Sequence, residues 1–298
     1  MRFNCPIYGQ ICIDERLKAY LDAPELQRLR RIRMGLTHYV YPSSTTTRFA
    51  HSLGVAHVAQ LACDHLNVSR ASRVWLCMQV AALYHDAGHV ATSHFMDNLQ
   101  LQVLGKGATD HEHRSTLVFR RVNDRIKQFT PAEANVVCAM ITGVFDQDDV
   151  KECGGQPFVF RIVHNANTDI ACGVDVDRLD YLFRDGSPCV LPTVAPYFLI
   201  STMGVGKNGD LVYDTKAQHE IASVQRLREH MHVVCYRHHT VLKVEKLLKQ
   251  AIERCINVVD LFKDDKTMNW LQVTDTWLDY TLRVGADDIM QRIDTRDF

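Results

Sequence analysis

Apolar residues recur at helical spacing along almost the whole chain, and this pattern predicts an all-α fold. One helix is expected from residue 24 to about residue 35, with Asp22 as its N-cap. A second is expected to begin near Arg48. A third, over residues 74–87, is apolar on nearly every side and is therefore expected in the core. The Thr-Pro-Ala-Glu sequence at 130–133 predicts a capping box that opens a further helix.

A strand pattern stands out in one place, from Val205 to Tyr213, where Asn208-Gly209 predicts a hairpin turn. The segment from Lys216 to Phe262 contains neither proline nor glycine, which predicts one long helix or two nearly continuous ones. We expect residues 1–203 to form the core. Residues 204–298 are then expected to add the small β-hairpin and a helical C-terminal extension, completing the active site within one structural unit.

The composition excludes several classes of protein. A formal net charge of −1 gives no strong nucleic-acid signal, and no stretch approaches the roughly 20 apolar residues that a membrane span needs. The 10 cysteines are scattered without a Cys-x-x-Cys pair, which predicts reduced thiols. With no apolar run like a signal peptide near Met1, a cytoplasmic or nuclear location is expected.

Histidines are numerous, at 15, and several cluster with carboxylates. His51, the adjacent pair His85-Asp86, and Asp177 offer two imidazoles and two carboxylates, a donor set that suits a divalent metal and leaves positions open for water and substrate. Adjacent helical residues point about 100° apart, so the His-Asp pair reaches one ion only at a helix end, which Gly88 supplies. Residue types alone leave two interpretations open, a metal site or hydrogen-bonded core histidines.

Three longer motifs contain these residues, in order and with comparable gaps: residues 48–55 (RFAHSLGV), 85–94 (HDAGHVATSH) and 173–181 (GVDVDRLDY). They resemble the deoxynucleoside triphosphate triphosphohydrolases of the HD superfamily, and most closely the branch whose animal member carries a sterile alpha motif before its HD domain. The resemblance covers the chain from about Asn4 to its C-terminus. It implies an HD-domain helical fold and one divalent ion (iron, manganese, zinc or magnesium) on His51, His85, Asp86 and Asp177. It also allows a Mg²⁺ ion bound with the substrate triphosphate.

The resemblance further implies that a deoxynucleoside triphosphate is hydrolysed to a deoxynucleoside and triphosphate. Asp86, His89 and His111 would be catalytic, and either histidine could protonate the leaving oxygen. Phosphates, sugar and base would be bound by Arg33, Met34, Arg48, Arg178, Tyr181, Asp185, Arg228, His232 and Tyr236. Relatives carry a glutamine-leucine pair where this chain has Arg33-Met34. This departure puts the preference for deoxyribose over ribose in doubt.

Asp22, Gln27 and Arg30 match the residues with which the animal relative binds a guanine effector, although Asp22 is also a natural N-cap. The relative continues beyond the position of Phe298 into a lobe that completes a second effector pocket, so a homodimer is expected here instead of a nucleotide-driven tetramer. Two other functions remain as alternatives. One is an HD phosphodiesterase or nucleotidase acting on another nucleotide, and the other is a nucleotide-binding protein without turnover.

Overall fold

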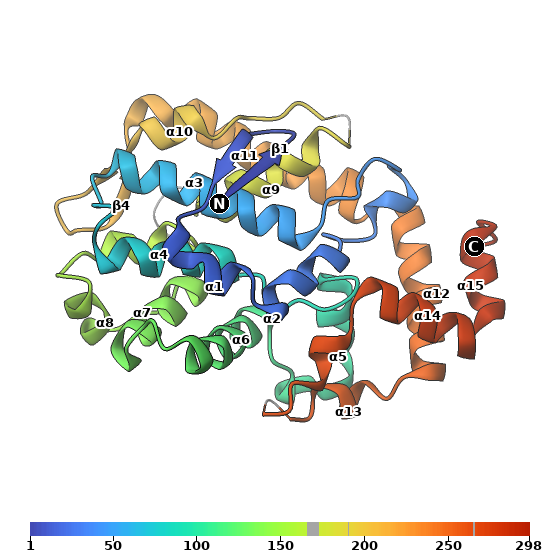
Figure 1. Ribbon diagram of the computed structural model, residues 1–298. Helices are drawn as coiled ribbons and strands as arrows, with labels where there is room; N and C mark the ends of the chain where they lie inside the picture. Colours follow the sequence, from blue (N-terminus) through green and yellow to red (C-terminus); the bar gives the residue numbers. More distant parts are fainter. Residues whose placement is uncertain (166–172, 190, 265) are drawn as a thin grey trace.

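The computed structural model describes residues 1–165, 173–189, 191–264 and 266–298. The described part is predominantly helical with two small antiparallel strand pairs, which confirms the predicted all-α class (Figure 1). The strands are β1 (Arg2–Cys5), β2 (Gly9–Cys12), β3 (Met203–Val205) and β4 (Leu211–Tyr213). The α-helices are α1 (Lys18–Leu21), α2 (Pro24–Gln27), α3 (Arg48–His65), α4 (Arg73–Tyr84), α5 (His94–Leu104), α6 (His111–Ile126), α7 (Pro131–Thr142), α8 (Gln147–Glu152), α9 (Val176–Gly186), α10 (Tyr197–Ser201), α11 (Gln218–Met231), α12 (His239–Cys255), α13 (Val258–Phe262), α14 (Asp275–Gly285) and α15 (Asp287–Asp294).

The core is built around α3 and α4, which pack against each other, with α9 on α3 and α7 on α4. Small side chains on α3 allow this close approach, since Ala56, Ala59 and Ala62 are fully buried. As the sequence predicted, α4 is buried on nearly every side. The helices that carry the predicted metal ligands therefore lie at the centre of the molecule.

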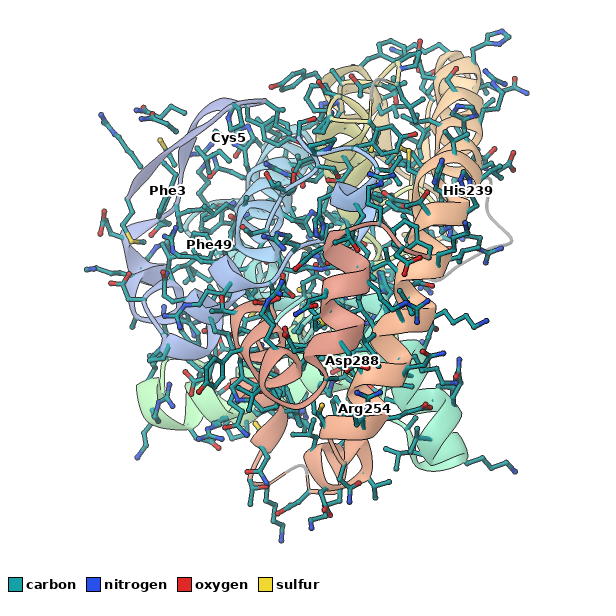
Figure 2. The ribbon with its side chains drawn as sticks, turned by 90° about the vertical axis from the view of Figure 1, so that its right-hand side faces the viewer. Phe3, Cys5, Phe49, His239, Arg254 and Asp288 are labelled. Carbon is teal, nitrogen blue, oxygen red and sulfur yellow. The ribbon has the colours of Figure 1, made fainter. Side chains whose placement is uncertain are left out.

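The N-terminal strands correct the sequence analysis, which identified strand only near residue 205. Arg2–Cys5 pairs with Gly9–Cys12 in a hairpin, with Phe3 opposite Ile11. Gly9 has φ +71°, a backbone conformation that glycine adopts at little cost. Ile11 is buried, and the Phe3 ring meets that of Phe49 on α3 edge to face at 6.4 Å (Figure 2). These strands are four residues long, too short for their alternation to stand out in the sequence.

Helix starts were predicted with mixed success. Thr47 caps α3, which begins at Arg48 as expected, and the predicted capping box opens α7. The prediction that Asp22 is an N-cap was wrong. Ala23 occupies that position in α2 without a side-chain bond, and Asp22 pairs with Lys18 one turn earlier. The helix expected to reach residue 35 ends at Gln27. A 3₁₀ turn over Arg28–Arg31 follows it.

The C-terminal third forms the second hairpin and a layer of helices beside α5. The hairpin was predicted correctly, with Gly209 at φ +83° in its turn. The boundary expected after residue 203 falls inside β3, and the division into two parts stays a prediction. A π-helical turn, His232–Tyr236, follows α11. Helices α14 and α15 pack on α12, where Arg254 Nη1 lies 2.6 Å from Asp288 Oδ1 (Figure 2). Among the described residues, no helix is long and apolar enough to cross a membrane.

Candidate active site

Four predicted metal ligands converge from three helices. The Nε2 atom of His51, on α3, lies 2.9 Å from Asp177 Oδ1 in the first turn of α9 and 3.1 Å from Nε2 of His85 at the end of α4. His85 Nε2 and Asp177 Oδ1 are 3.6 Å apart. Asp86 Oδ2 lies 3.5 Å and 3.6 Å from the two Nε2 atoms. Helix α4 ends at Tyr84, so His85 and Asp86 follow it in a turn and both point to one place, as the sequence required.

The hydrogen bonds behind the two imidazoles show that this donor set fits a cation. His85 Nδ1 lies 2.9 Å from the Ala82 carbonyl oxygen, which only accepts, so Nδ1 carries the proton. His51 Nδ1 lies 2.7 Å from Asp180 Oδ2 and is fixed in the same way. When the rings are neutral, both Nε2 atoms thus present lone pairs to each other and to Asp177. A group made up of acceptors alone requires a positive charge at its centre, which a divalent transition metal provides.

The surrounding charge points in the same direction. Burial lowers the pKa of His51, but Asp177, Asp180 and Asp86 outweigh it and raise the pKa to about 10. The pKa of His85 is also raised, because Asp86 and Asp177 overcome its burial. Arg48 and Arg184 pair with Asp86 and Asp180, so Asp177 is left without a fixed cation when both rings are neutral. This negative charge attracts a cation, either a proton or a metal ion.

Asp180 was quoted in the third motif but not predicted to be functional. It is fully buried, and Arg184 Nε and Nη2 donate to its two oxygens at 2.8 and 2.9 Å. A Cβ on Gly54 of α3 would lie 1.9 Å from Asp180 Oδ1, so only glycine leaves room for this carboxylate. Its position one turn after Asp177 on α9 was the available signal. Asp180 orients the His51 ring, and a carboxylate in this role typically sustains metal affinity.

Arg48 connects the metal site to the neighbouring loop. Its Nη1 donates to Asp86 Oδ2 at 2.6 Å and its Nε to Ser93 Oγ at 3.0 Å. The side chain is only 4% exposed, yet it lines the main cavity described below. Its charge is therefore held in place at the cavity wall.

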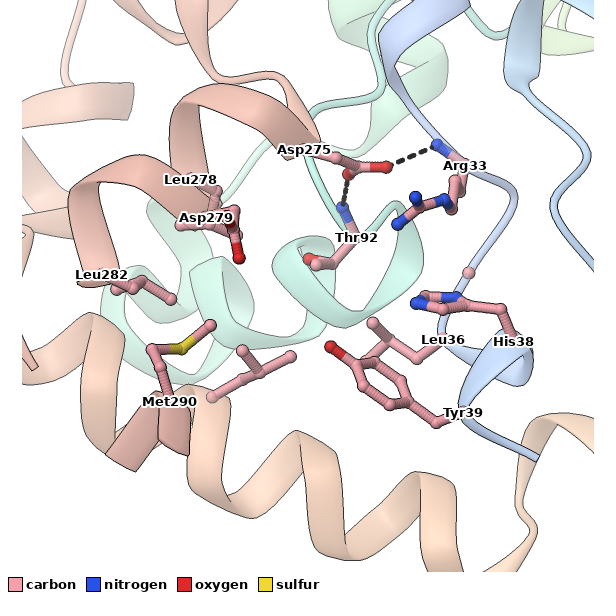
Figure 3. A pocket seen from close by; sticks show the side chains of 12 residues that line it. Arg33, Leu36, His38, Tyr39, Thr92, Asp275, Leu278, Asp279, Leu282 and Met290 are labelled. Carbon is pink, nitrogen blue, oxygen red and sulfur yellow. Dashed lines mark hydrogen bonds between the residues drawn. The ribbon is translucent and has the colours of Figure 1, made fainter. Parts of the chain in front are cut away.

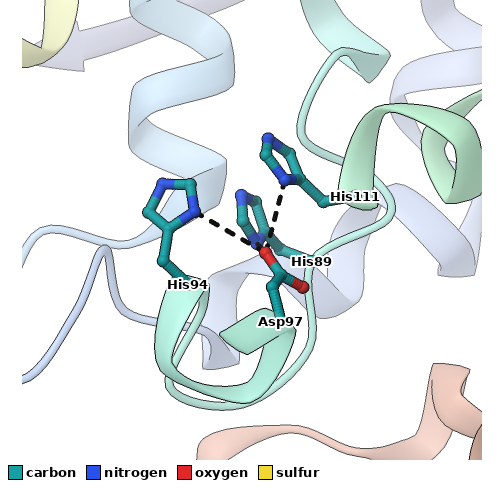
Figure 4. Close-up of side chains that lie close together, drawn as sticks. All are labelled: His89, His94, Asp97 and His111. Carbon is teal, nitrogen blue, oxygen red and sulfur yellow. Dashed lines mark ion pairs between the residues drawn. The ribbon is translucent and has the colours of Figure 1, made fainter. Parts of the chain in front are cut away.

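A second group, the Asp97 cluster (His89, His94, Asp97 and His111), lies beside the metal site (Figure 4). Asp97 Oδ2 is 3.4 Å from His89 Nδ1, 3.6 Å from His94 Nδ1 and 3.3 Å from His111 Nδ1, and Arg114 pairs with its other oxygen. The sequence analysis named His89 and His111 but missed His94 and Asp97 as site residues. Their i, i+3 spacing at the start of α5 was the available signal.

The histidines of this cluster differ in protonation. Burial and the nearby Arg48 and His111 charges lower the pKa of His89 well below its usual value. Burial also lowers the pKa of His111, but Asp97 and Glu112 outweigh it, so the net shift is upward. The two rings stack with centroids 4.0 Å apart. Burial thus favours the neutral form of His89, whereas the carboxylates beside His111 favour its protonated form.

Most predicted substrate residues surround one cavity of about 620 Å³. It lies between the metal site, the Asp97 cluster and the segment formed by α11 and the π-helical turn that ends at Tyr236. The predicted site residues that line it are Met34, Arg48, His85, Asp86, His111, Asp177, Arg178, Tyr181, Asp185, Arg228, His232 and Tyr236. His51 and His89 are fully buried behind its wall.

Four predicted residues lie elsewhere. Arg33 lines a separate cavity of about 70 Å³ (Figure 3), although its neighbour Met34 lines the main one. Arg33 forms an isolated bridge with Thr47 and Met34 follows it in a bend, and the two side chains face different cavities. Of the predicted effector residues, Arg30 Nε donates to Gln27 Oε1 at 2.7 Å, whereas Asp22 pairs with Lys18. None of these four residues lines the main cavity.

Comparison with known proteins shows what this chain is similar to. Residues 48–185 match the HD domain. The chain is 26% identical over 292 residues to an HD domain-containing protein of Acanthamoeba polyphaga mimivirus, covering 90% of this chain and 60% of that protein. It is 24% identical over 274 residues to a deoxynucleoside triphosphate triphosphohydrolase homologue of Dictyostelium discoideum, with 88% and 51% covered. It is 30% identical over 205 residues to a human deoxynucleoside triphosphate triphosphohydrolase, with 61% and 32% covered.

Proposed function

We propose that this chain hydrolyses deoxynucleoside triphosphates to deoxynucleoside and triphosphate, on the basis of the match of residues 48–185 to the HD domain and of the site described above. One observation carries the proposal: a single cavity of about 620 Å³ brings together a metal donor set, a histidine whose pKa is raised and several arginines. The relatives named as triphosphohydrolases support the choice of substrate. The chain spans 51% and 32% of the lengths of these two relatives. The activity that their names state is therefore proposed for this chain.

His51, His85, Asp86 and Asp177 would hold the metal ion. When bound there, a divalent cation activates water and offsets the charge that develops on the phosphate. The chain contributes the fixed orientation of both imidazoles, through Asp180 and the Ala82 carbonyl. The metal's identity is open among iron, manganese, zinc and magnesium, since this donor set suits all four.

Arginines would bind the triphosphate. Arg48, Arg178 and Arg228 line the cavity, and each presents a planar guanidinium that suits phosphate oxygens. Arg48 is already fixed by Asp86 and Ser93, so it loses little freedom when it meets the reacting phosphate. We assign Arg48 to the α-phosphate and the other two to the rest of the triphosphate chain.

Proton transfer would complete the reaction. Water adds to the α-phosphorus, the bond from phosphorus to the 5′ oxygen breaks, and the leaving oxygen takes a proton. His111 is suited to supply it, because its pKa is raised and its side chain reaches the cavity, whereas His89 is neutral and buried. His94 shares Asp97 and also lines the cavity, so substitution of His94 is the matched comparison for His111.

The nucleoside would lie against Tyr181, Asp185, His232 and Tyr236. Tyr236 and His232 belong to the π-helical turn and meet edge to face at 5.3 Å, forming an aromatic wall. Such a wall favours stacking over hydrogen bonding to base edges, so broad base selectivity is expected. Met34 lies where it could crowd a ribose 2′-hydroxyl, as the leucine of relatives does.

The homodimer predicted from the sequence stays a prediction. Light scattering with and without nucleotide tests it. A guanine effector site is not proposed, because Asp22 pairs with Lys18 instead of joining Gln27 and Arg30.

The decisive experiment identifies the products. Each deoxynucleoside triphosphate is incubated with the protein and with Mn²⁺, Fe²⁺, Zn²⁺ or Mg²⁺, and released phosphates are separated by ion chromatography. We expect triphosphate and deoxynucleoside in equal amounts. Release of orthophosphate or pyrophosphate would favour the nucleotidase or phosphodiesterase alternative. Binding without any product would favour a nucleotide-binding protein.

A further inference from the structure

The loop that follows the metal ligands is held in a strained conformation. Thr92 and Ser93 are consecutive, and both have positive φ, 63° and 53°. Neither is glycine, and such residues persist in this region only where their surroundings force them to. This loop joins the His85-Asp86 turn to His94 and Asp97 on α5. Its conformation therefore sets the distance between the two halves of the site.

Val273, just before α14, and Asp275, the first residue of α14, hold this loop from outside the HD domain. The Ala91 amide donates to the Val273 carbonyl at 2.9 Å. The Thr92 amide donates to Asp275 Oδ1 at 3.0 Å, and the Arg33 amide donates to Asp275 Oδ2 at 2.8 Å (Figure 3). One carboxylate thus clamps two loops that are far apart in sequence.

Both clamped loops lead directly to the cavity. Ser93, next to Thr92, donates through Oγ to the Arg33 carbonyl at 2.7 Å and accepts from Arg48 Nε at 3.0 Å. Met34, next to Arg33, offers its carbonyl to Arg48 Nη2 at 3.3 Å. Arg48 in turn donates to the metal ligand Asp86. A continuous series of hydrogen bonds therefore connects the Asp275 carboxylate with Arg48.

Trp270, in the same C-terminal segment, supports the turn that carries the metal ligands through two arginine side chains. Arg28 Nη2 donates to the Ala87 and His89 carbonyls at 2.6 and 2.7 Å, and Arg114 Nε donates to that of Gly88 at 2.9 Å. Both guanidinium groups lie over the ring of Trp270, at 5.8 and 5.7 Å from its centroid. Trp270 is fully buried. The C-terminal segment thus supports this loop indirectly through Arg28 and Arg114, and directly through its bonds to Ala91 and Thr92.

We propose that Asp275 is a positioning residue for hydrolysis: it fixes the Thr92–Ser93 loop and the Arg33–Met34 backbone so that Arg48 meets the reacting phosphate. This inference rests on the proposed function. Asp275 belongs to the separate small cavity and touches no part of the main one. Its effect is therefore exerted through Arg48, while Arg178 and Arg228 hold the substrate independently of it.

The test compares Asp275→Asn, which keeps the side-chain volume but removes one acceptor, with Asp275→Ala. Asp279→Asn is the matched control, since Asp279 is exposed one turn later on α14 and pairs with Arg283 at 3.1 Å. We expect kcat of both Asp275 variants to fall by about tenfold or more, with KM within about threefold, because binding by Arg178 and Arg228 is retained. Metal content should match the wild type, as should the stoichiometry of a bound analogue in which a methylene group replaces the 5′ oxygen and so removes the scissile bond. The control should retain wild-type kcat.

Several results would overturn the proposal. A kcat within about twofold of the wild type, per analogue-binding chain, would exclude a positioning role for Asp275. An equal loss in Asp279→Asn would attribute the effect to charge at the start of α14. Amide hydrogen exchange tests the clamp without turnover, and Asp275→Asn should speed exchange at Thr92 and Arg33. If the wild-type protein releases no triphosphate, the proposed function fails, while unchanged exchange would refute the clamp itself.

Discussion

Replacing Gly54 by alanine should destabilise the protein, although in a helix the same change usually stabilises by about 1 kcal/mol. Gly54 lies in the middle of α3, where α9 crosses it. The added Cβ would lie 1.9 Å from Asp180 Oδ1 and 2.2 Å from Arg184 Nη2. Neither atom belongs to a flexible surface group, because both side chains are at most 4% exposed. The carboxylate must therefore move, and the His51 ring that it orients must move with it.

The magnitude follows from what is displaced. Overpacking a buried site costs about 1–3 kcal/mol. Separating a buried ion pair such as Asp180–Arg184 costs about 3–5 kcal/mol when it is complete. A shift of a few tenths of an ångström loses part of this, so after the helix-propensity gain we expect a net loss of about 1–3 kcal/mol. Metal affinity should fall about 10- to 100-fold, the usual effect of removing the partner of a metal-binding histidine.

Urea denaturation at constant metal concentration gives the stability, and competition with a chromogenic chelator gives the metal affinity. The control is a double-mutant cycle in which the second change is the paired substitution Asp180→Ala and Arg184→Ala, which removes both groups that the new methyl would strike. In that background Gly54→Ala should be neutral or stabilising, so the two changes should be strongly non-additive. A Gly54→Ala protein that is more stable than the wild type and binds metal equally well would refute the steric argument.

Three further predictions test other parts of the site. Asp177→Ala should abolish turnover and metal binding while the circular dichroism spectrum stays helical; loss of the fold would favour a structural role. Burial raises the pKa of Asp185 to about 6, so the folded state holds its proton more tightly than the unfolded chain, and stability should fall as pH rises from about 4 to about 6. Without metal, Asp185→Asn should remove that fall and gain up to about 3 kcal/mol at pH 7 in urea denaturation; an unchanged pH profile would contradict this. Arg33→Gln should change KM for every deoxynucleoside triphosphate by less than about twofold, since Arg33 lies outside the main cavity, and a uniform loss of about 1.5–3 kcal/mol would show a phosphate contact instead.

The sequence predicted those parts of the site that local geometry determines. His85 and Asp86 had to follow a helix end to reach one ion, and they do. Arg228, His232 and Tyr236, at intervals of four, line one cavity as predicted, although a π-helical turn replaces regular helix over the last two.

Long-range contacts explain what the sequence left out. Arg33 and Met34 are adjacent, and contacts from distant segments hold their backbone, among them the bond from the Arg33 amide to Asp275 and the bond from the Met34 amide to the Thr46 carbonyl. Asp275 lies 242 residues away from Arg33, so no local pattern could connect them. His94 and Asp97 were missed for a related reason, since the strained Thr92–Ser93 turn folds α5 back toward His89. Asp22 was wrongly predicted to be an N-cap, because its carboxylate pairs with Lys18 one turn away.

The contacts of Trp270 with Arg28 and Arg114 determine which residues a domain exchange between relatives must include. The recognisable HD domain covers residues 48–185, but Arg28 precedes it and Trp270 follows it, and both support the backbone around the metal ligands. A chimera that exchanges residues 48–185 alone would thus separate the catalytic turn from its flanking supports. Exchanges between relatives should therefore include Arg28 and Trp270 together with residues 48–185.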